Sequence, residues 1–140
     1  MLKVFLGGTC NGSKWRQFVK TNANVDFFDP VVEVWNEEAR EREKFEKQNC
    51  DICLYVITPK MTGVYAIAEV TYDSCKRPGK TVFCFVGEDE GVSLAVPQIK
   101  SLMAVKELLE TEGVPCFTTL EDLVQHLNRL ATEVHPSLFS

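Results

Sequence analysis

Glu69 is the residue whose type and surroundings most favour chemistry. It lies in Val-Tyr-Ala-Ile-Ala-Glu-Val (64–70), where the residues next to it are apolar. Tyr65 and Tyr72 stand four residues before it and three residues after it, so the three side chains share one flank of a predicted helix. A carboxylate there is either solvated at the helix edge or held in a cleft at the carboxyl end of the preceding strand, where open parallel sheets bind ligands.

A glycine turn, Gly7-Gly8-Thr9, follows the first predicted strand. Glycines let backbone amides approach a ligand closely, and Ser13 can cap the helix that comes next. The turn has neither the GxGxxG pattern of a dinucleotide site nor the lysine of a P-loop, so it indicates neither ligand. It is a binding loop or a tight strand–helix turn. Trp15 also has two interpretations, a stacking surface for a base or a core anchor for the first helix.

The cysteines favour core positions over a metal or redox site. Cys50-x-x-Cys53 matches half of such a motif, but it enters a strand, and no second ligand pair stands at recognisable spacing. Cys53, Cys75, Cys84 and Cys116 lie in apolar segments and are predicted to be buried. Reduced cytosolic thiols are therefore expected, with no metal and no organic cofactor. A redox or zinc protein is the least favoured hypothesis.

Composition limits the classes of function. A chain of 140 residues, 45% hydrophobic and 25% charged, is typical of one soluble globular domain, here residues 1–140. The formal net charge of −5 argues against binding to a nucleic-acid polymer. No apolar run approaches the ~20 residues of a membrane span. No signal-peptide pattern precedes the first strand, so a cytoplasmic location is expected.

Predicted strands alternate with predicted helices along the chain. Strands are expected at residues 2–6, 25–28, 52–57, 81–86 and 114–117, and helices at residues 14–21, 37–48, 64–75, 97–112 and from about 120 onward. This alternation predicts an α/β fold, a single-domain doubly wound five-stranded parallel sheet of flavodoxin-like or Rossmann-like order.

Three segments carry finer expectations. Residues 37–48 form a charged helix with a weak apolar stripe, which is expected to cover a sheet edge or meet a partner subunit. The acidic residues 87–91 are expected to form a loop. The helix that carries Glu69 is expected to turn one apolar face inward. This predicted face consists of Val64, Ile67, Ala68, Thr71 and Cys75.

Four segments together resemble a known enzyme family. They are Val-Phe-Leu-Gly-Gly-Thr, Phe-Phe-Asp-Pro, Asp-Ile-Cys-Leu-Tyr-Val-Ile-Thr-Pro and Gly-Val-Tyr-Ala-Ile-Ala-Glu-Val. The combination resembles the nucleoside 2-deoxyribosyltransferases and their nucleotide N-glycosidase relatives over about residues 3–86. The unit of strand, proline, loop and glutamate-bearing helix is what marks the family.

The resemblance implies roles for several residues. Glu69 matches the nucleophile that attacks the anomeric carbon of a 2-deoxyribosyl group. Glu43 stands where the family has an aspartate that positions the nucleophile and manages the proton of the departing base. Gly7, Gly8 and Thr9 match the turn that lines the nucleobase and sugar pocket. Asp29, Thr62 and Gly63 are further candidates for substrate binding, and Trp15 and Tyr65 are candidate stacking surfaces for a base. The family's neighbouring subunits commonly complete each site, which implies a homo-oligomer with shared sites.

The sequence also departs from the family pattern. Phe5 replaces a tyrosine whose hydroxyl orients the nucleophile in one branch. Gly63 stands where transferases have an aspartate that faces the sugar 5′-hydroxyl and nucleotide hydrolases have a serine that faces phosphate. Glu43 is one methylene longer than the usual aspartate. The substrate class, nucleoside or nucleotide, therefore stays open.

Two hypotheses follow. In the first, the protein cleaves or transfers at the N-glycosidic bond of a small-molecule (deoxy)nucleoside or nucleotide. An anionic group beneath the sugar stabilises the oxocarbenium-like transition state, attack by Glu69 gives a covalent glycosyl-enzyme, and a second acid protonates the leaving base. In the second, a non-catalytic nucleotide- or metabolite-binding module has kept the pocket and lost the chemistry.

Overall fold

The computed structural model describes residues 1–10, 12–31 and 34–134. Within them, five strands form a parallel sheet in the order β2-β1-β3-β4-β7. These strands are β1 (Lys3–Gly8), β2 (Asp26–Phe28), β3 (Ile52–Ile57), β4 (Thr81–Phe85) and β7 (Cys116–Phe117). The doubly wound, flavodoxin-like order predicted from the sequence is confirmed.

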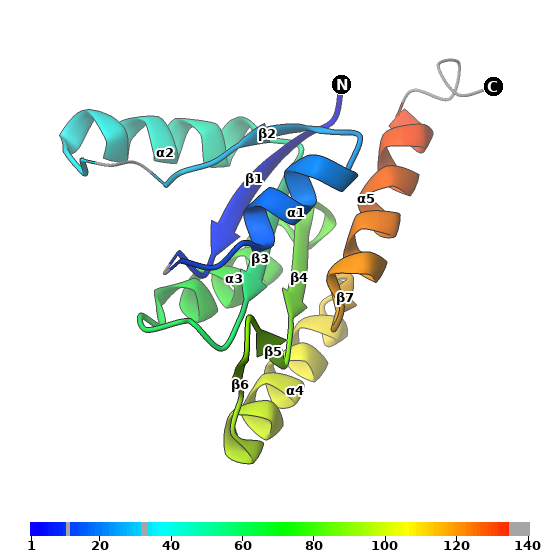
Figure 1. The fold of residues 1–140 in the computed structure, drawn as a ribbon. Helices are drawn as coiled ribbons and strands as arrows, with labels where there is room; N and C mark the ends of the chain where they lie inside the picture. Colours follow the sequence, from blue (N-terminus) through cyan, green and yellow to red (C-terminus); the bar gives the residue numbers. More distant parts are fainter. Residues whose placement is uncertain (11, 32–33, 135–140) are drawn as a thin grey trace.

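Helices cover both faces of the sheet (Figure 1). They are α1 (Trp15–Asn22), α2 (Glu37–Asn49), α3 (Tyr65–Lys76), α4 (Val96–Thr111) and α5 (Leu120–Val134), with a short 3₁₀ turn, η1 (Pro78–Lys80), before β4. One core lies beneath α1 and α5, and the other lies beneath α3 and α4. No helix in the described part of the chain is both long enough and apolar enough to cross a bilayer.

The central strand β3 supplies both cores. All six of its residues are buried. Because successive side chains of a strand point to opposite faces, Leu54 and Val56 pack beneath α1 and α5, whereas Cys53, Tyr55 and Ile57 pack beneath α3 and α4. This explains why the sequence of β3 is a continuous apolar run rather than an alternating one.

The predicted cap of α1 is wrong, because its N-cap is Lys14 rather than Ser13 and the Lys14 side chain forms no capping hydrogen bond among the described residues. Local residues do mark three other helix ends. The Asn36 side chain accepts a hydrogen bond from the Ala39 backbone amide at 2.8 Å and so caps α2. Thr119 accepts in the same way from Asp122 at the start of α5. Gly113 follows α4 with φ of 86°, a left-handed conformation that glycine adopts without strain.

The predicted inner face of α3 is right for Ile67, which packs against the core beneath this helix, but wrong for three of its other four residues. Val64 is 69% exposed, and Ala68 and Cys75 are also exposed. The buried residues of the helix are Val70, Asp73 and Ser74. The error has a physical cause: Asp73 is buried because it has partners on other elements, and a pattern of apolar residues cannot recognise a buried carboxylate.

The acidic segment after β4 is more ordered than predicted. Instead of a simple loop, it forms an antiparallel hairpin of β5 (Glu88–Asp89) and β6 (Val92–Ser93). Glu90 pairs with Lys60 at 2.7 Å and with Lys14 at 3.4 Å, so the hairpin is tied to the loops that follow β1 and β3.

Helix α2 projects from the body of the molecule, starting far from the sheet and approaching it at its C-terminal end (Figure 1). Glu46 is its one buried residue, and that carboxylate accepts from the Lys3 ammonium at 2.7 Å. Ala39, Glu43 and Lys47 are half-buried and recur every four residues, so they share one side of the helix. Part of the ambiguous segment before α2, residues 32–33, lies outside the described residues.

Candidate active site

A cavity of about 520 Å³ opens at the carboxyl ends of β1 and β3, bordered by α2 and α3. It lies at the point where the chain leaves β1 and β3 in opposite directions, the usual ligand site of such sheets. The cavity is lined by Phe5, Gly7, Gly8, Thr9, Cys10, Arg16, Pro30, Val31, Trp35, Glu43, Met61, Thr62, Gly63, Tyr65, Ala66 and Glu69. All sequence-based candidates except Trp15 and Asp29 are therefore brought together.

Gly7 and Gly8, predicted to form a turn after the first strand, are instead the last two residues of β1 and pair with Tyr55 and Val56 of β3. Gly8 has φ of 114°, and a Cβ there would lie 2.1 Å from the Val56 carbonyl oxygen. A Cβ on Gly7 would lie 2.9 Å from the Tyr55 ring. Any larger residue would push β1 and β3 apart at this edge. The two glycines are thus required by close backbone approach, and they give the cavity a floor of bare main chain.

Polar contacts fix Thr9, the residue that follows β1. The Thr9 hydroxyl accepts from the Thr58 backbone amide at 3.0 Å and so joins the ends of β1 and β3. Arg16, which is buried, donates to the carbonyls of Leu6 and Thr9. Burial lowers the pKa of Arg16, but a guanidinium stays charged at physiological pH. Sequence analysis missed Arg16, because nothing in the helix pattern shows that its side chain turns back onto the loop.

The two remaining candidates lie elsewhere. Asp29 pairs with Arg16 at 3.3 Å and with Lys20 at 2.7 Å, so it holds Arg16 from behind the cavity. Trp15 is 2% exposed, and its indole N–H donates to the Thr9 carbonyl at 2.8 Å. It borders a separate hollow of about 640 Å³ near α1 and the start of α5. Of its two interpretations, the structure favours the core anchor.

Two carboxylates line the cavity in contrasting environments. Glu69 of α3 accepts from the Lys47 ammonium at 2.6 Å, and the side chains of the pair are 20% and 18% exposed. Within the described part of the chain, no ammonium or guanidinium forms an ion pair with Glu43 of α2. Burial raises the pKa of Glu43, the charge of Glu69 raises it further, and the charge of Lys47 partly offsets both effects. A carboxylate paired with a cation, beside a carboxyl group whose pKa is raised, is the combination that acid-assisted nucleophilic chemistry uses.

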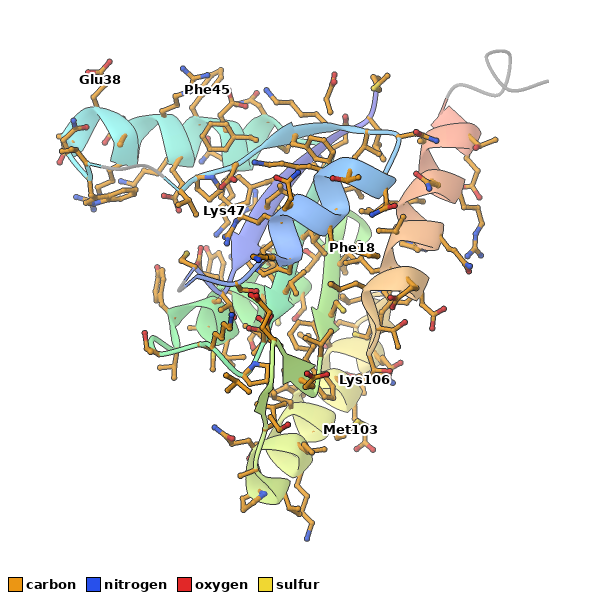
Figure 2. All side chains as sticks on the ribbon, viewed as in Figure 1. Phe18, Glu38, Phe45, Lys47, Met103 and Lys106 are labelled. Atoms are coloured by element: carbon orange, nitrogen blue, oxygen red, sulfur yellow. The ribbon has the colours of Figure 1, made fainter. Side chains whose placement is uncertain are left out.

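Lys47, like Arg16, is a residue of the site that sequence analysis missed. It lies one helical turn after Glu43, on the side of α2 that faces the sheet and α3 (Figure 2). Phe45, two residues earlier, is 62% exposed. The four-residue spacing of Ala39, Glu43 and Lys47 contained the signal. This signal was hard to recognise, because most of the charged residues of this helix are solvated and Lys47 resembles them.

A buried network supports Lys47 from behind. Asp73 is fully buried, lies 3.8 Å from the Lys47 ammonium, and accepts hydrogen bonds from the Tyr55 hydroxyl and the Arg77 guanidinium. Burial and the hydrogen bond to Asp73 raise the pKa of Tyr55, which keeps its hydroxyl neutral. The Lys47 ammonium also lies 5.4 Å from the centre of the Tyr55 ring. The ion pair at the cavity is thus continuous with the core.

Aromatic side chains complete the walls. Phe5 is buried and stacks on Phe28 with ring centres 5.8 Å apart, so it contributes a ring and no hydroxyl. Tyr65 and Trp35 line the cavity while remaining 75% and 57% exposed, which places them at its mouth. Gly63 adds no side chain to the neighbouring wall.

The thiols behave mainly as core groups. Cys50, Cys53 and Cys84 are buried and free, and Cys116 is half-buried, whereas Cys75 is exposed, contrary to the prediction. Burial raises the pKa of Cys50 to about 11, which suppresses the reactive thiolate. In residues 1–10, 12–31 and 34–134, His, Cys, Asp and Glu side chains do not gather in groups of three or more that could hold a metal ion.

Comparison with known protein families gives one match. The model of a family described as nucleoside 2-deoxyribosyltransferase-like matches residues 1–88. This segment includes β1 to β4 and every residue that lines the cavity. No curated protein matches the chain.

Proposed function

The chain belongs to the nucleoside 2-deoxyribosyltransferase-like family, and we propose that it cleaves or transfers at the N-glycosidic bond of a (deoxy)nucleoside or nucleotide. One observation carries the proposal. Glu69 and Glu43 converge on the same cavity from different helices, one paired with a cation and the other held toward its protonated form by burial. This arrangement supplies a nucleophile and an acid on either side of a reacting bond.

In the proposed reaction, a Glu69 carboxylate oxygen attacks the anomeric carbon of the sugar. The bond between that carbon and the base nitrogen breaks as the new ester bond forms, and Glu43 gives its proton to the departing base. The resulting glycosyl-enzyme is then attacked by a second base or by water. Transfer returns a nucleoside, whereas hydrolysis returns the free sugar, and Glu43 accepts the proton of the attacking group.

The cavity walls suit such a substrate. A volume of about 520 Å³ falls within the usual range of small-molecule sites. Tyr65 and Trp35 at the mouth offer ring faces for a planar base, and the end of β1 offers main chain for the sugar. Since Gly63 brings neither a carboxylate nor a hydroxyl, the proposal includes both nucleosides and 5′-monophosphates as substrates.

Base release is the direct test. We expect the purified protein to liberate or exchange the base of at least one member of a panel of nucleosides, deoxynucleosides and their 5′-monophosphates. Chromatography detects the free base, and parallel incubations with and without a second base distinguish transferase from hydrolase. If no member of the panel released or exchanged its base, the enzymatic proposal would be rejected.

A second candidate function rests on the same ion pair. The Glu69 carboxylate is engaged by Lys47 at 2.6 Å, and Phe5 offers no hydroxyl to orient it. A pocket with a neutralised nucleophile suits a non-catalytic nucleotide-binding module. This alternative predicts saturable binding of a panel member by calorimetry, with no base released on long incubation.

We also propose that a second copy of this chain packs against α2 near the cavity. Three large apolar residues at or just before this helix, Val34, Trp35 and Phe45, are between 57% and 71% exposed. Trp35 is at once exposed and part of the cavity wall, so a partner placed there would close the mouth. Acidic and basic residues alternate on the solvated side of α2, which makes this surface complementary to itself in a two-fold contact.

Light scattering tests this assembly. We expect a dimer or larger species at micromolar concentration, and monomers after Trp35→Glu or Phe45→Glu, because each change buries an unpaired charge in the contact. The matched control is Leu108→Glu, which alters an equally exposed apolar residue on α4. A monomeric wild-type protein, or an assembly unaffected by both α2 variants, would contradict the proposal.

A further inference from the structure

Lys47 is paired with one carboxylate of the cavity and lies one helical turn from the other. Its ammonium contacts Glu69 on α3 at 2.6 Å, and its charge favours the ionisation of Glu43 on the same helix. The ammonium also lies 5.4 Å from the centre of the Tyr55 ring and 3.8 Å from Asp73. The side chain is only 18% exposed, so water screens these charges incompletely.

We propose that Lys47 is a positioning residue that holds Glu69 as an aligned carboxylate before the reaction and stabilises the carboxylate of Glu43 once Glu69 has become an ester. The proposal rests on the function proposed above. It adds a third residue, a lysine, that balances the charge of the two reacting carboxylates. Lys47 itself neither gives nor receives a proton.

The charges of the three groups account for this role. Before attack, Glu69 is anionic, Glu43 is protonated and Lys47 is cationic, so their sum is zero. Attack converts Glu69 into a neutral ester, breaks the bond to the base, and moves the Glu43 proton to the base nitrogen. Glu43 is then anionic, and the sum is again zero. The step therefore moves one negative charge from Glu69 to Glu43. The nearby cation keeps this poorly solvated site neutral before and after the step, whereas without it the site would hold one uncompensated negative charge throughout.

The ionisable groups that face Lys47 favour a single positive charge at this position. On α3, Glu69 and Asp73 face it, and on β3 the Tyr55 hydroxyl stays neutral. Asp73 is already bound to Arg77, which leaves Glu69 as the closest partner of Lys47. On α2 itself, Glu43 is the carboxylate one turn away. The neighbouring β1 contributes Phe5, which has no polar atom, so the alignment of Glu69 depends on Lys47.

The first test measures protonation directly and needs no substrate. Carbon-13 NMR follows the carboxyl signal of Glu43 against pH in wild type, Lys47→Met and Lys47→Arg, with a Glu43→Gln spectrum to assign it. Loss of the cation removes an influence that lowers the pKa of Glu43, so we expect the Glu43 titration to move to higher pH in Lys47→Met. Lys47→Arg keeps the charge and should keep the wild-type titration.

The second test is kinetic and uses the best substrate of the panel. We expect Lys47→Met to lower kcat about 10- to 100-fold with a small change in KM, because misaligned reacting atoms affect the step more than binding. The high-pH limb of its rate profile should move upward with Glu43. Lys47→Arg should restore most of the rate. Lys44→Met, on the solvated side of the same helix, is the matched control.

The two tests separate two failures. A folded Lys47→Met protein whose Glu43 titrates as in wild type overturns the role of Lys47, whatever the activity. A shifted titration in a protein that never releases base retains the charge coupling and rejects the enzymatic proposal instead. The inference would also be overturned if Lys47→Met lost activity, Lys47→Arg did not restore it, and the pH profile stayed unchanged. That combination would show that the role of Lys47 is merely structural.

Discussion

Replacement of Glu69 by glutamine is expected to lower kcat/KM for base release or exchange by about 10³-fold or more. The amide has nearly the same shape as the carboxylate, but it bears no charge to stabilise an oxocarbenium-like sugar and is a poor nucleophile. Glu69 lines the cavity, and the amide oxygen of glutamine can still accept a hydrogen bond from the Lys47 ammonium. The loss should therefore appear in chemistry rather than in folding, which circular dichroism and thermal unfolding would check.

The matched control for this prediction is Glu107→Gln, which makes the same chemical change at an exposed position of α4. It should keep wild-type activity. Mass spectrometry of rapidly quenched reactions should find one added sugar group on the wild-type chain and none on Glu69→Gln. A Glu69→Gln protein that keeps activity within tenfold of wild type would remove the nucleophile from the proposed mechanism.

The fold was predictable because its signals are local. The continuous apolar run of β3 indicates a strand buried on both faces, and Asn36, Gly113 and Thr119 indicate helix ends through their own side chains or conformations. The alternation of strands and helices then restricts the topology, since parallel strands need crossovers of one hand. The carboxyl ends of β1 and β3 are adjacent in that topology, so Gly7 and Glu69 could be placed near one cavity before the structure was known.

Other parts of the site depend on contacts between distant elements. In the sequence, Lys47 looks like the solvated charged residues around it. Its role differs from theirs only because α3 brings the Glu69 carboxylate into contact with its ammonium. Arg16 lies in a short helix, and its role appears only where the loop after β1 folds back over it. Most of the inner face of α3 was mispredicted for the same reason, because Asp73 is stabilised by Tyr55 and Arg77 rather than by apolar character.

Asp73 carries the largest expected effect on stability. Replacement by alanine would leave the buried Tyr55 hydroxyl and the half-buried Arg77 guanidinium without their carboxylate partner. Removing one member of a buried ionic network typically costs about 3–5 kcal/mol, which is a large share of the stability of a domain this size. We expect a corresponding fall in the midpoint of thermal unfolding of about 10–15 °C, measured by calorimetry.

The control variants separate the charge from the hydrogen bonds. Asp73→Asn keeps a hydrogen-bond acceptor for Tyr55, so it should lower the free energy of unfolding less than Asp73→Ala does. Cys75→Ala changes an exposed position of the same helix, and its free energy of unfolding should stay within about 0.5 kcal/mol of wild type. In a double-mutant cycle, Tyr55→Phe combined with Asp73→Asn should cost less than the sum of the single changes, because each removes the same contact. Additive losses, or an Asp73→Ala protein as stable as wild type, would show that Asp73 is not bound as the structure has it.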